Sequence, residues 1–90
     1  MYSINYSRRF SKHLVLCKKR GLNLDKIKKA VQLLAETGTL PPNYKPHRLH
    51  GSYEGCWEAH IEPDWLIVWK IEHDRLVLLL VDTGTHSDLF

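Results

Sequence analysis

The stretch CWEAHIEPDWLIVWKIEHDRLVLLLVDT, residues 56–83, decides the fold of this 90-residue chain. It contains three hydrophobic runs, residues 56–61, 65–71 and 75–83, whose two-residue periodicity predicts three β-strands. Only EPD and then EHD separate one run from the next. Connections this short join antiparallel neighbours, because a parallel crossover needs about a dozen residues or more. The middle run is apolar on both faces, so we expect it at the centre of the sheet.

Two amphipathic helices are predicted before these strands. The first follows Ser7, a residue type that caps helix N-termini, and ends at Gly21. The second begins near Asn23 or Asp25 and ends at Gly38. Apolar residues recur at helical spacing in both segments: Phe10, Leu14 and Cys17 in the first, and Leu24, Ile27, Val31 and Leu34 in the second.

The remaining segments complete a single α+β domain of order β-α-α-β-β-β. Residues 1–6, MYSINY, alternate in the manner of a short first strand. Residues 39–46 contain three prolines and are expected to form a loop. An additional short strand is compatible with residues 47–49. We expect the two helices to cover one face of a small antiparallel sheet.

The composition is that of an ordinary folded soluble domain, with 43% hydrophobic and 26% charged residues. No apolar run approaches the ~20 residues that span a bilayer, and the N-terminus lacks the order of a secretory signal. A cytoplasmic location without a membrane is therefore expected. In that compartment Cys17 and Cys56 are expected to be reduced and buried.

Charge is divided unevenly along the chain. Residues 1–50 hold eleven Lys and Arg against two acids, whereas residues 51–90 hold two against eight. This asymmetry favours a basic surface for a polyanion, built mostly from the N-terminal half. The alternative, that these side chains only solvate two helices, fits the pattern equally well.

The six histidines fall into two groups. We expect His13, on the first helix, and His73, in the second turn, to be solvated, while His50 is ambiguous. The other three are predicted at strand edges or in neighbouring loops, where segments from one end of a sheet converge: His47, His60 and His86.

The Glu-Pro turn brings His60 and Asp64 to one rim, because Pro63 fixes its own backbone and favours an extended residue before it. No metal is expected, since the histidine spacings match no compact ligand set. Imidazole titrates near about pH 6.5, and a carboxylate orients it or accepts a proton, so the cluster suits acid–base catalysis. With a basic half to hold phosphates, the favoured reaction is RNA cleavage, whose nucleophile is the internal 2′-hydroxyl. A structural role for each histidine is the alternative.

Two aromatic residues have two interpretations each. Phe90, at the end of DTGTHSDLF, either closes the core or offers a surface on which an RNA base stacks. Trp65 either anchors the central strand or stacks on RNA, and anchoring is favoured.

Three segments, KPHRLHGSYEG, AHIEPDWLIVWK and TGTHSDLF, together resemble the YafQ group within the RelE/ParE superfamily of bacterial toxin–antitoxin toxins. The resemblance spans nearly the whole chain and implies one RelE-like toxin domain over residues 1–90. It implies a metal-independent, cofactor-free endoribonuclease that enters the A site of the 70S ribosome and cuts mRNA. A cognate antitoxin would neutralise it, and the pair would repress its own promoter, bound to operator DNA through the antitoxin.

Position by position, the resemblance makes His47, His60, Asp64 and His86 the candidate catalytic set. His86 is the first choice for the general acid. Asp64 and His60 are candidates for activating the 2′-hydroxyl, and His47 for positioning or sharing the proton. The RNA-binding rim would comprise Lys45, Arg48, Trp65 and Phe90.

The chain departs from the family pattern at Trp57 and Asp82, where relatives often carry arginines that would face the scissile phosphate. Lys45 and Arg48, which bracket His47, are the expected replacements. Two other functions stay open: a ParE-like gyrase inhibitor without enzymatic activity, and a basic nucleic-acid-binding module with structural histidines. Neither of these needs convergent proton-transfer groups.

Overall fold

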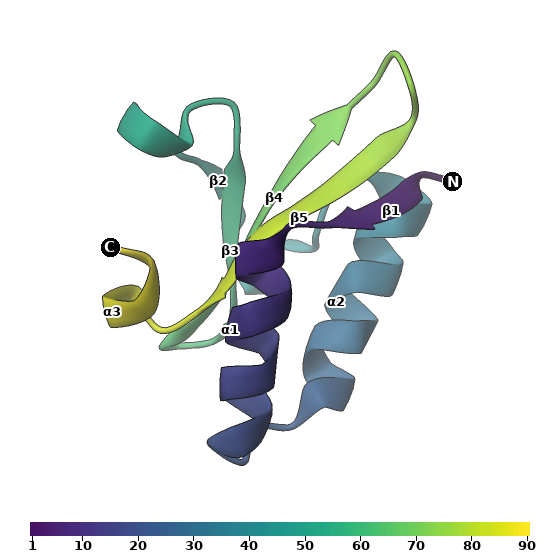
Figure 1. The fold of residues 1–90 in the computed structure, drawn as a ribbon. Coiled ribbons are helices and arrows are strands. Elements are labelled where there is room, and N and C mark those ends of the chain that lie inside the picture. The colour runs from purple at the N-terminus through teal and green to yellow at the C-terminus, as the bar shows by residue number, and fades with distance from the viewer.

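The computed structural model describes residues 1–90. It shows a five-stranded sheet with two helices packed against it (Figure 1). The elements are β1 (Ser3–Tyr6), α1 (Arg8–Lys19), α2 (Leu24–Thr37), β2 (His47–Arg48), β3 (Trp57–Glu62), β4 (Trp65–Glu72), β5 (Val77–Gly84) and α3 (His86–Leu89). Single 3₁₀ turns at Pro42–Tyr44 and Gly51–Tyr53 flank β2. No helix has the length and apolar character needed to cross a membrane.

The strand order is β1-β5-β4-β3-β2, so the apolar β4 is central, as predicted. Strands β2 to β5 pair antiparallel, and the short strand expected near residue 47 is β2. Strand β1 differs, because it pairs in parallel with β5, from Ser3 opposite Val77 to Tyr6 opposite Leu80. This pairing stops where α1 begins, so the last half of β5, residues 81–84, has no strand partner on that edge.

The helix boundaries follow the predicted capping residues. The Ser7 side chain accepts a hydrogen bond from the Phe10 amide, and the Asn23 side chain accepts one from the Asp25 amide. Asn23 is thus the cap of α2, and Asp25 lies in its first turn, where a carboxylate favours the helix dipole. Gly38 ends α2 in the left-handed conformation, with φ of 79°.

The core lies on both faces of the sheet. Alternation along β4 sends Trp65, Ile67 and Trp69 towards α1 and α2, where they join the larger apolar cluster. Leu66 and Val68 point the other way, into a smaller cluster that contains Cys56 and the C-terminal Leu89. Both helices therefore cover one face, as expected, and the second face is only partly covered. Both cysteines are buried and unpaired, as expected.

Candidate active site

The pairing of the strands aligns polar residues across the partly covered face. His47 lies opposite Glu58, Glu58 opposite Val68, and Val68 opposite Asp82. Residues directly opposite one another share a face of the sheet, so these four form one row. His60, two residues after Glu58 on β3, lies on the same face in the next row. Strand pairing thus gathers these polar side chains on the face of the sheet that points away from α2.

Asp64 and His86 form the closest pair of the site. The Nδ1 atom of His86 lies 2.6 Å from Oδ1 of Asp64, and the backbone amide of His86 donates to the same oxygen at 3.0 Å. This amide, followed by the His86 ring, holds the pKa of Asp64 below its usual range. Asp64 is therefore ionised at neutral pH, and it leaves Nε2 of His86 free.

His60 lies between the other two histidines. Its ring centroid is 6.0 Å from that of His86 and 6.5 Å from that of His47. Its Nδ1 atom lies 3.3 Å from the carbonyl oxygen of Pro63, at the turn that the sequence singled out. The structure therefore brings together the three histidines and Asp64 that the sequence analysis selected.

Glu58 is a member of this site that the sequence analysis missed. It is 5% exposed, and its Oε1 lies 3.2 Å from Nε2 of His47. The other ring nitrogen of His47 lies 3.2 Å from the Lys45 carbonyl oxygen. The Oε2 atom of Glu58 is buried without a hydrogen-bond partner. The two-residue spacing from His60 on a predicted strand was the signal for Glu58.

Helix α3 fixes the position of His86, and the sequence analysis did not predict this helix. The Thr85 side chain caps it, and the Thr85 amide donates a hydrogen bond to Oδ2 of Asp88 at 2.8 Å. Arg20 donates two hydrogen bonds to Asp88, at 2.6 and 3.0 Å, and holds its pKa well below the usual range. The Thr-x-x-Asp spacing of a capping box was the available signal.

Phe90 does not close the core, because its side chain is 62% exposed and Leu89 is the buried residue. It packs edge-on against Tyr53, with ring centroids 5.5 Å apart and planes at 76°. Phe90 therefore presents an aromatic surface at the end of the site, and the stacking of an RNA base on it stays a prediction. Tyr53 is an additional aromatic that the sequence analysis missed.

Trp65 lies in the core and not on the rim, so its assignment to RNA binding is wrong. It is 1% exposed, and its Nε1 donates to Oγ1 of Thr83 at 3.0 Å. The alternation of β4 turns its ring towards the helices. The interpretation of Trp65 as an anchor of the central strand is confirmed.

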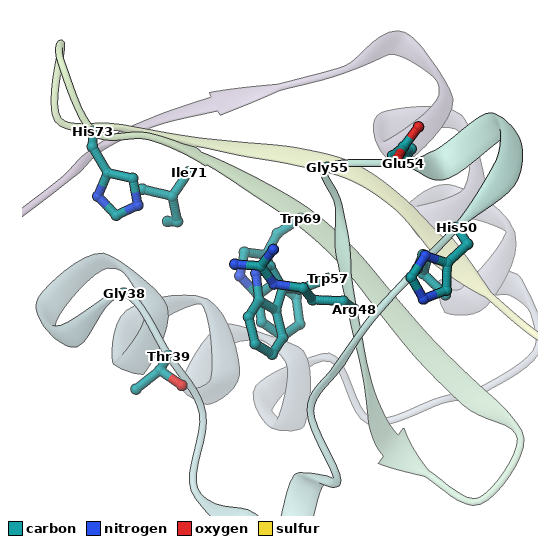
Figure 2. A pocket seen from close by; sticks show the side chains of 11 residues that line it. Gly38, Thr39, Arg48, His50, Glu54, Gly55, Trp57, Trp69, Ile71 and His73 are labelled. Carbon is teal, nitrogen blue, oxygen red and sulfur yellow. The ribbon is translucent and has the colours of Figure 1, made fainter.

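Arg48 also lies away from the histidines, because neighbouring residues of a strand face opposite sides of a sheet. Its guanidinium carbon lies 5.4 Å from the centroid of the Trp57 ring, which stacks on Trp69 at 6.4 Å (Figure 2). This stack lines a hollow of about 450 Å³ on the helix-covered face. The expectation that Arg48 supplies a cation beside His47 is therefore wrong. Lys45 is exposed and shares a hollow with His60, so its assignment to the rim stays a prediction.

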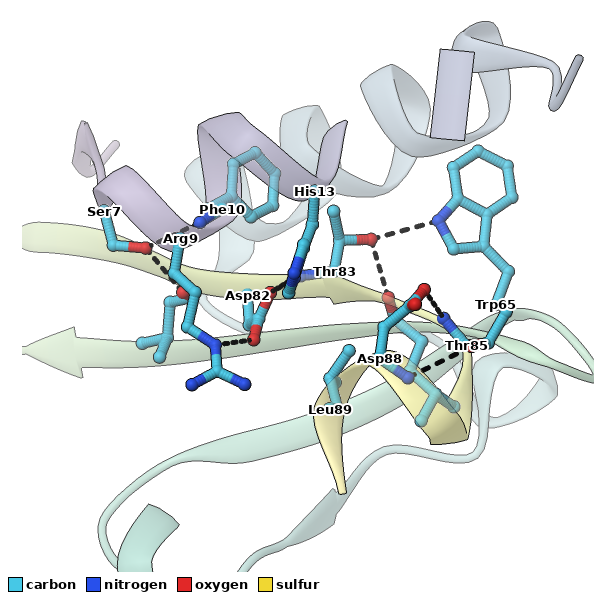
Figure 3. A network of polar contacts seen from close by, with 12 residues as sticks. Ser7, Arg9, Phe10, His13, Trp65, Asp82, Thr83, Thr85, Asp88 and Leu89 are labelled. Carbon is cyan, nitrogen blue, oxygen red and sulfur yellow. Dashed lines mark hydrogen bonds and ion pairs between the residues drawn. The ribbon is translucent and has the colours of Figure 1, made fainter. Parts of the chain in front are cut away.

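Asp82 is fully buried, and two side chains of α1 bind its carboxylate (Figure 3). Nε of Arg9 lies 2.6 Å from Oδ2, and Nδ1 of His13 lies 2.6 Å from Oδ1. The side chain of His13 is only 16% exposed, so its expected solvation is wrong. No sequence pattern indicates this contact, because about seventy residues separate its partners.

No set of three or more His, Cys, Asp or Glu side chains is arranged to hold a metal ion. The imidazoles and the carboxylate of the site instead pair with one another and with backbone carbonyls.

Residues 2–90 match the family described as the bacterial toxin of the type II toxin–antitoxin system, YafQ. The chain is 43% identical to the mRNA interferase toxin YafQ of Escherichia coli K12 over 88 residues, which are 97% of this chain and 94% of that protein. The chain belongs to the YafQ family. The YafQ fold extends over the whole chain, since the crystal structure of the E. coli DinJ–YafQ complex superposes with a TM-score of 0.89 at 38% identity, covering 100% and 99% of the two chains. A metal-bound toxin from Helicobacter pylori superposes with a TM-score of 0.91 at 39% identity and full coverage of both chains.

Proposed function

We propose that this YafQ-family chain is an endoribonuclease that cuts mRNA in the A site of the 70S ribosome, by acid–base chemistry without a metal. The observation that carries the proposal is the Asp64–His86 pair, which leaves one imidazole nitrogen free beside His60 on the partly covered face. The names of the E. coli relatives support mRNA as the substrate. Cleavage of ribosome-bound mRNA places the reaction in the cytoplasm.

His60 is suited to the role of general base. A carbonyl oxygen only accepts hydrogen bonds, so the contact with Pro63 places the proton of neutral His60 on Nδ1. The Nε2 atom then carries the lone pair and accepts the proton of the 2′-hydroxyl. The 2′-oxygen attacks the adjacent phosphorus and forms a pentacoordinate phosphorane.

His86 is suited to the role of general acid. Ionised Asp64 accepts from Nδ1 and stabilises the imidazolium form of His86, which gives its Nε2 proton to the leaving 5′-oxygen. The products are a 2′,3′-cyclic phosphate and a 5′-hydroxyl. His47 lies at the far end of the line and contacts acceptors through both ring nitrogens. In its doubly protonated form it stabilises negative charge on the phosphorane.

A cognate antitoxin is the proposed protein partner. The relative from E. coli forms the DinJ–YafQ complex, whose toxin covers the full length of this chain. An antitoxin of the same kind would neutralise this toxin and carry the pair to operator DNA.

The test is cleavage of a defined mRNA by the purified chain, with and without translating ribosomes. We expect cuts only on ribosomes, ending in 2′,3′-cyclic phosphate, and an unchanged rate when the chain is treated with EDTA and dialysed before it is added to the ribosomes. His86→Ala and Asp64→Asn should lower the rate about 10²–10⁴-fold, because each removes part of the acid. His73→Ala is the matched control, since His73 is exposed in the β4–β5 turn.

Two outcomes contradict the proposal. Loss of cleavage by a chain that was treated with EDTA and dialysed beforehand, with recovery on adding a metal back, would show that a metal bound to the chain takes part. A folded chain that arrests growth without cutting RNA in either setting would favour the gyrase inhibitor.

A further inference from the structure

The guanidinium of Arg9 is held in place by a buried charge. Asp82, which is fully buried, accepts from Nε of Arg9 at 2.6 Å and from the Thr83 amide at 2.8 Å, besides its contact with His13. The hydrogen bond to Asp82 raises the pKa of Arg9, so the side chain stays charged. Asp82 thereby fixes one edge of the guanidinium.

The other edge of Arg9 faces solvent. Its side chain is 54% exposed, and its hydrogen bond to the protein uses Nε alone. Both Nη groups are therefore available to a ligand, in the fork geometry that binds two oxygens of a carboxylate or a phosphate. The buried carboxylate of Asp82 thus orients a guanidinium whose two Nη groups are exposed and have no partner. This arrangement suits a residue that binds a ligand better than one that only forms a structural ion pair.

Arg9 reaches the same face of the sheet as the histidines. Strand β1 stops pairing at Leu80, and α1 follows at once, so Arg9 extends over the free edge of β5 to Asp82 (Figure 3). Asp82 belongs to the row that contains Glu58 and His47. His47 lies three strands away from Asp82, at a spacing of about 4.8 Å per strand. A short run of nucleotides spans this distance.

Arg9 also lies at the aromatic end of the site. Tyr53 packs against the smaller apolar cluster, whose Val68 lies opposite Asp82, and the charge of Arg9 acts to lower the pKa of Tyr53 against the larger effect of burial. Tyr53 in turn packs against Phe90, the exposed aromatic on which a base can stack. A cation beside a stacking surface is the combination that binds single-stranded nucleic acid.

We propose that Arg9, oriented by Asp82, binds a backbone phosphate of single-stranded RNA on the Phe90 side of the reacting nucleotide. The identity of the ligand rests on the proposed function. Since Arg48 lies on the opposite face, Lys45 and Arg9 supply cations at the two ends of the site. Arg9 thus takes the phosphate-binding role that the sequence analysis assigned to Arg48.

The test compares Arg9 with its neighbour Arg8, which is also exposed on the first turn of α1 but makes no ion pair. Binding of a 2′-O-methylated single-stranded RNA, which cannot be cleaved, is measured by fluorescence anisotropy at several salt concentrations. Arg9→Ala should weaken binding about tenfold or more and reduce the salt slope by about one unit. Arg8→Ala removes the same charge and should weaken binding less than about threefold.

Arg9→Lys covers the case in which Arg9→Ala fails to fold, because lysine still pairs with Asp82. An ammonium held at Asp82 lacks the planar pair of N–H groups that matches two phosphate oxygens, so binding should still fall more than in Arg8→Lys. Equal effects at positions 8 and 9, in proteins that circular dichroism shows to be folded, would overturn the proposal.

Cleavage by the unmodified chain separates this inference from the proposed function. If the chain cuts mRNA but both positions behave alike, Arg9 is not a phosphate-binding residue and the nuclease stands. If it cuts no RNA but loses RNA binding only at Arg9, the binding residue stands and the nuclease does not.

Discussion

Glu58 is a buried carboxylate that contacts a residue of the candidate site. Its Oε1 contacts His47, but its Oε2 is buried without a partner, which is costly for a carboxylate. Nothing in the packing of the smaller cluster requires a charge at this position. We infer that the charge of Glu58 is used through its contact with His47.

Glu58→Gln should separate stability from activity. The amide has the same shape and removes the buried charge, so the free energy of unfolding should stay within about 1 kcal/mol of the original. Cleavage on ribosomes should fall about tenfold or more, because His47 loses its anionic partner. Urea unfolding and single-turnover cleavage measure the two effects, with Glu54→Gln as the exposed control. Equal activity of the two variants would show that the charge of Glu58 is not used.

The sequence predicted that the three histidines and Asp64 lie near one another, but not the individual contacts that depend on distant segments. His60 and Asp64 were expected together because the Glu-Pro turn between them is local. The pairing of Asp64 with His86 depends on where β5 ends and α3 begins, which no short pattern states. Arg9 is one of the eleven basic residues in the N-terminal half, none of which the pattern distinguishes, and the early end of β1 brings it to Asp82.

At the level of elements, strands and long helices were predictable and α3 was not. Its four residues are too few to show helical periodicity, and it depends on its cap and on Arg20. Because α3 depends on its cap, it is sensitive to Gly84, the residue before the cap. Gly84 has φ of 148°, and a Cβ there would lie 2.6 Å from Oδ2 of Asp88.

Gly84→Ala should therefore displace Asp88 and loosen the capping box that positions His86. We expect the free energy of unfolding to fall by about 1–3 kcal/mol and cleavage to fall more than tenfold. Gly51→Ala is the control, since Gly51 also has positive φ, at 68°, but open space around it. It should cost about 1 kcal/mol and leave cleavage nearly unchanged. Matching losses of activity in the two variants would contradict the role of the close contact.

At the scale of the whole molecule, the sheet separates a helix-covered face from the face that carries the site. The sequence analysis expected the two helices to cover one face, and it predicted antiparallel pairing for β3 to β5. The parallel pairing of β1 was not predicted, because a four-residue strand carries no signal for its partner. The ion pair between Arg20 and Asp88 connects the helix layer with the face that carries the site. Arg20 is the C-cap of α1, and Asp88 lies in α3, 68 residues later.

This connection between the layers predicts how stability depends on pH. The pKa of Asp88 is lower in the folded chain than in the unfolded one, chiefly because of Arg20, so folding favours the ionised carboxylate. Its contribution is complete above the unfolded pKa of about 4 and is lost as the pH falls towards the folded value. Asp88→Asn should lower the free energy of unfolding by about 1–2 kcal/mol at pH 7, and this difference should shrink steadily below about pH 4. Urea unfolding at a series of pH values measures the difference, with Asp74→Asn, in the exposed β4–β5 turn, as the control. A difference that stays constant down to about pH 2 would show that Asp88 acts by its shape in the capping box and not by its charge.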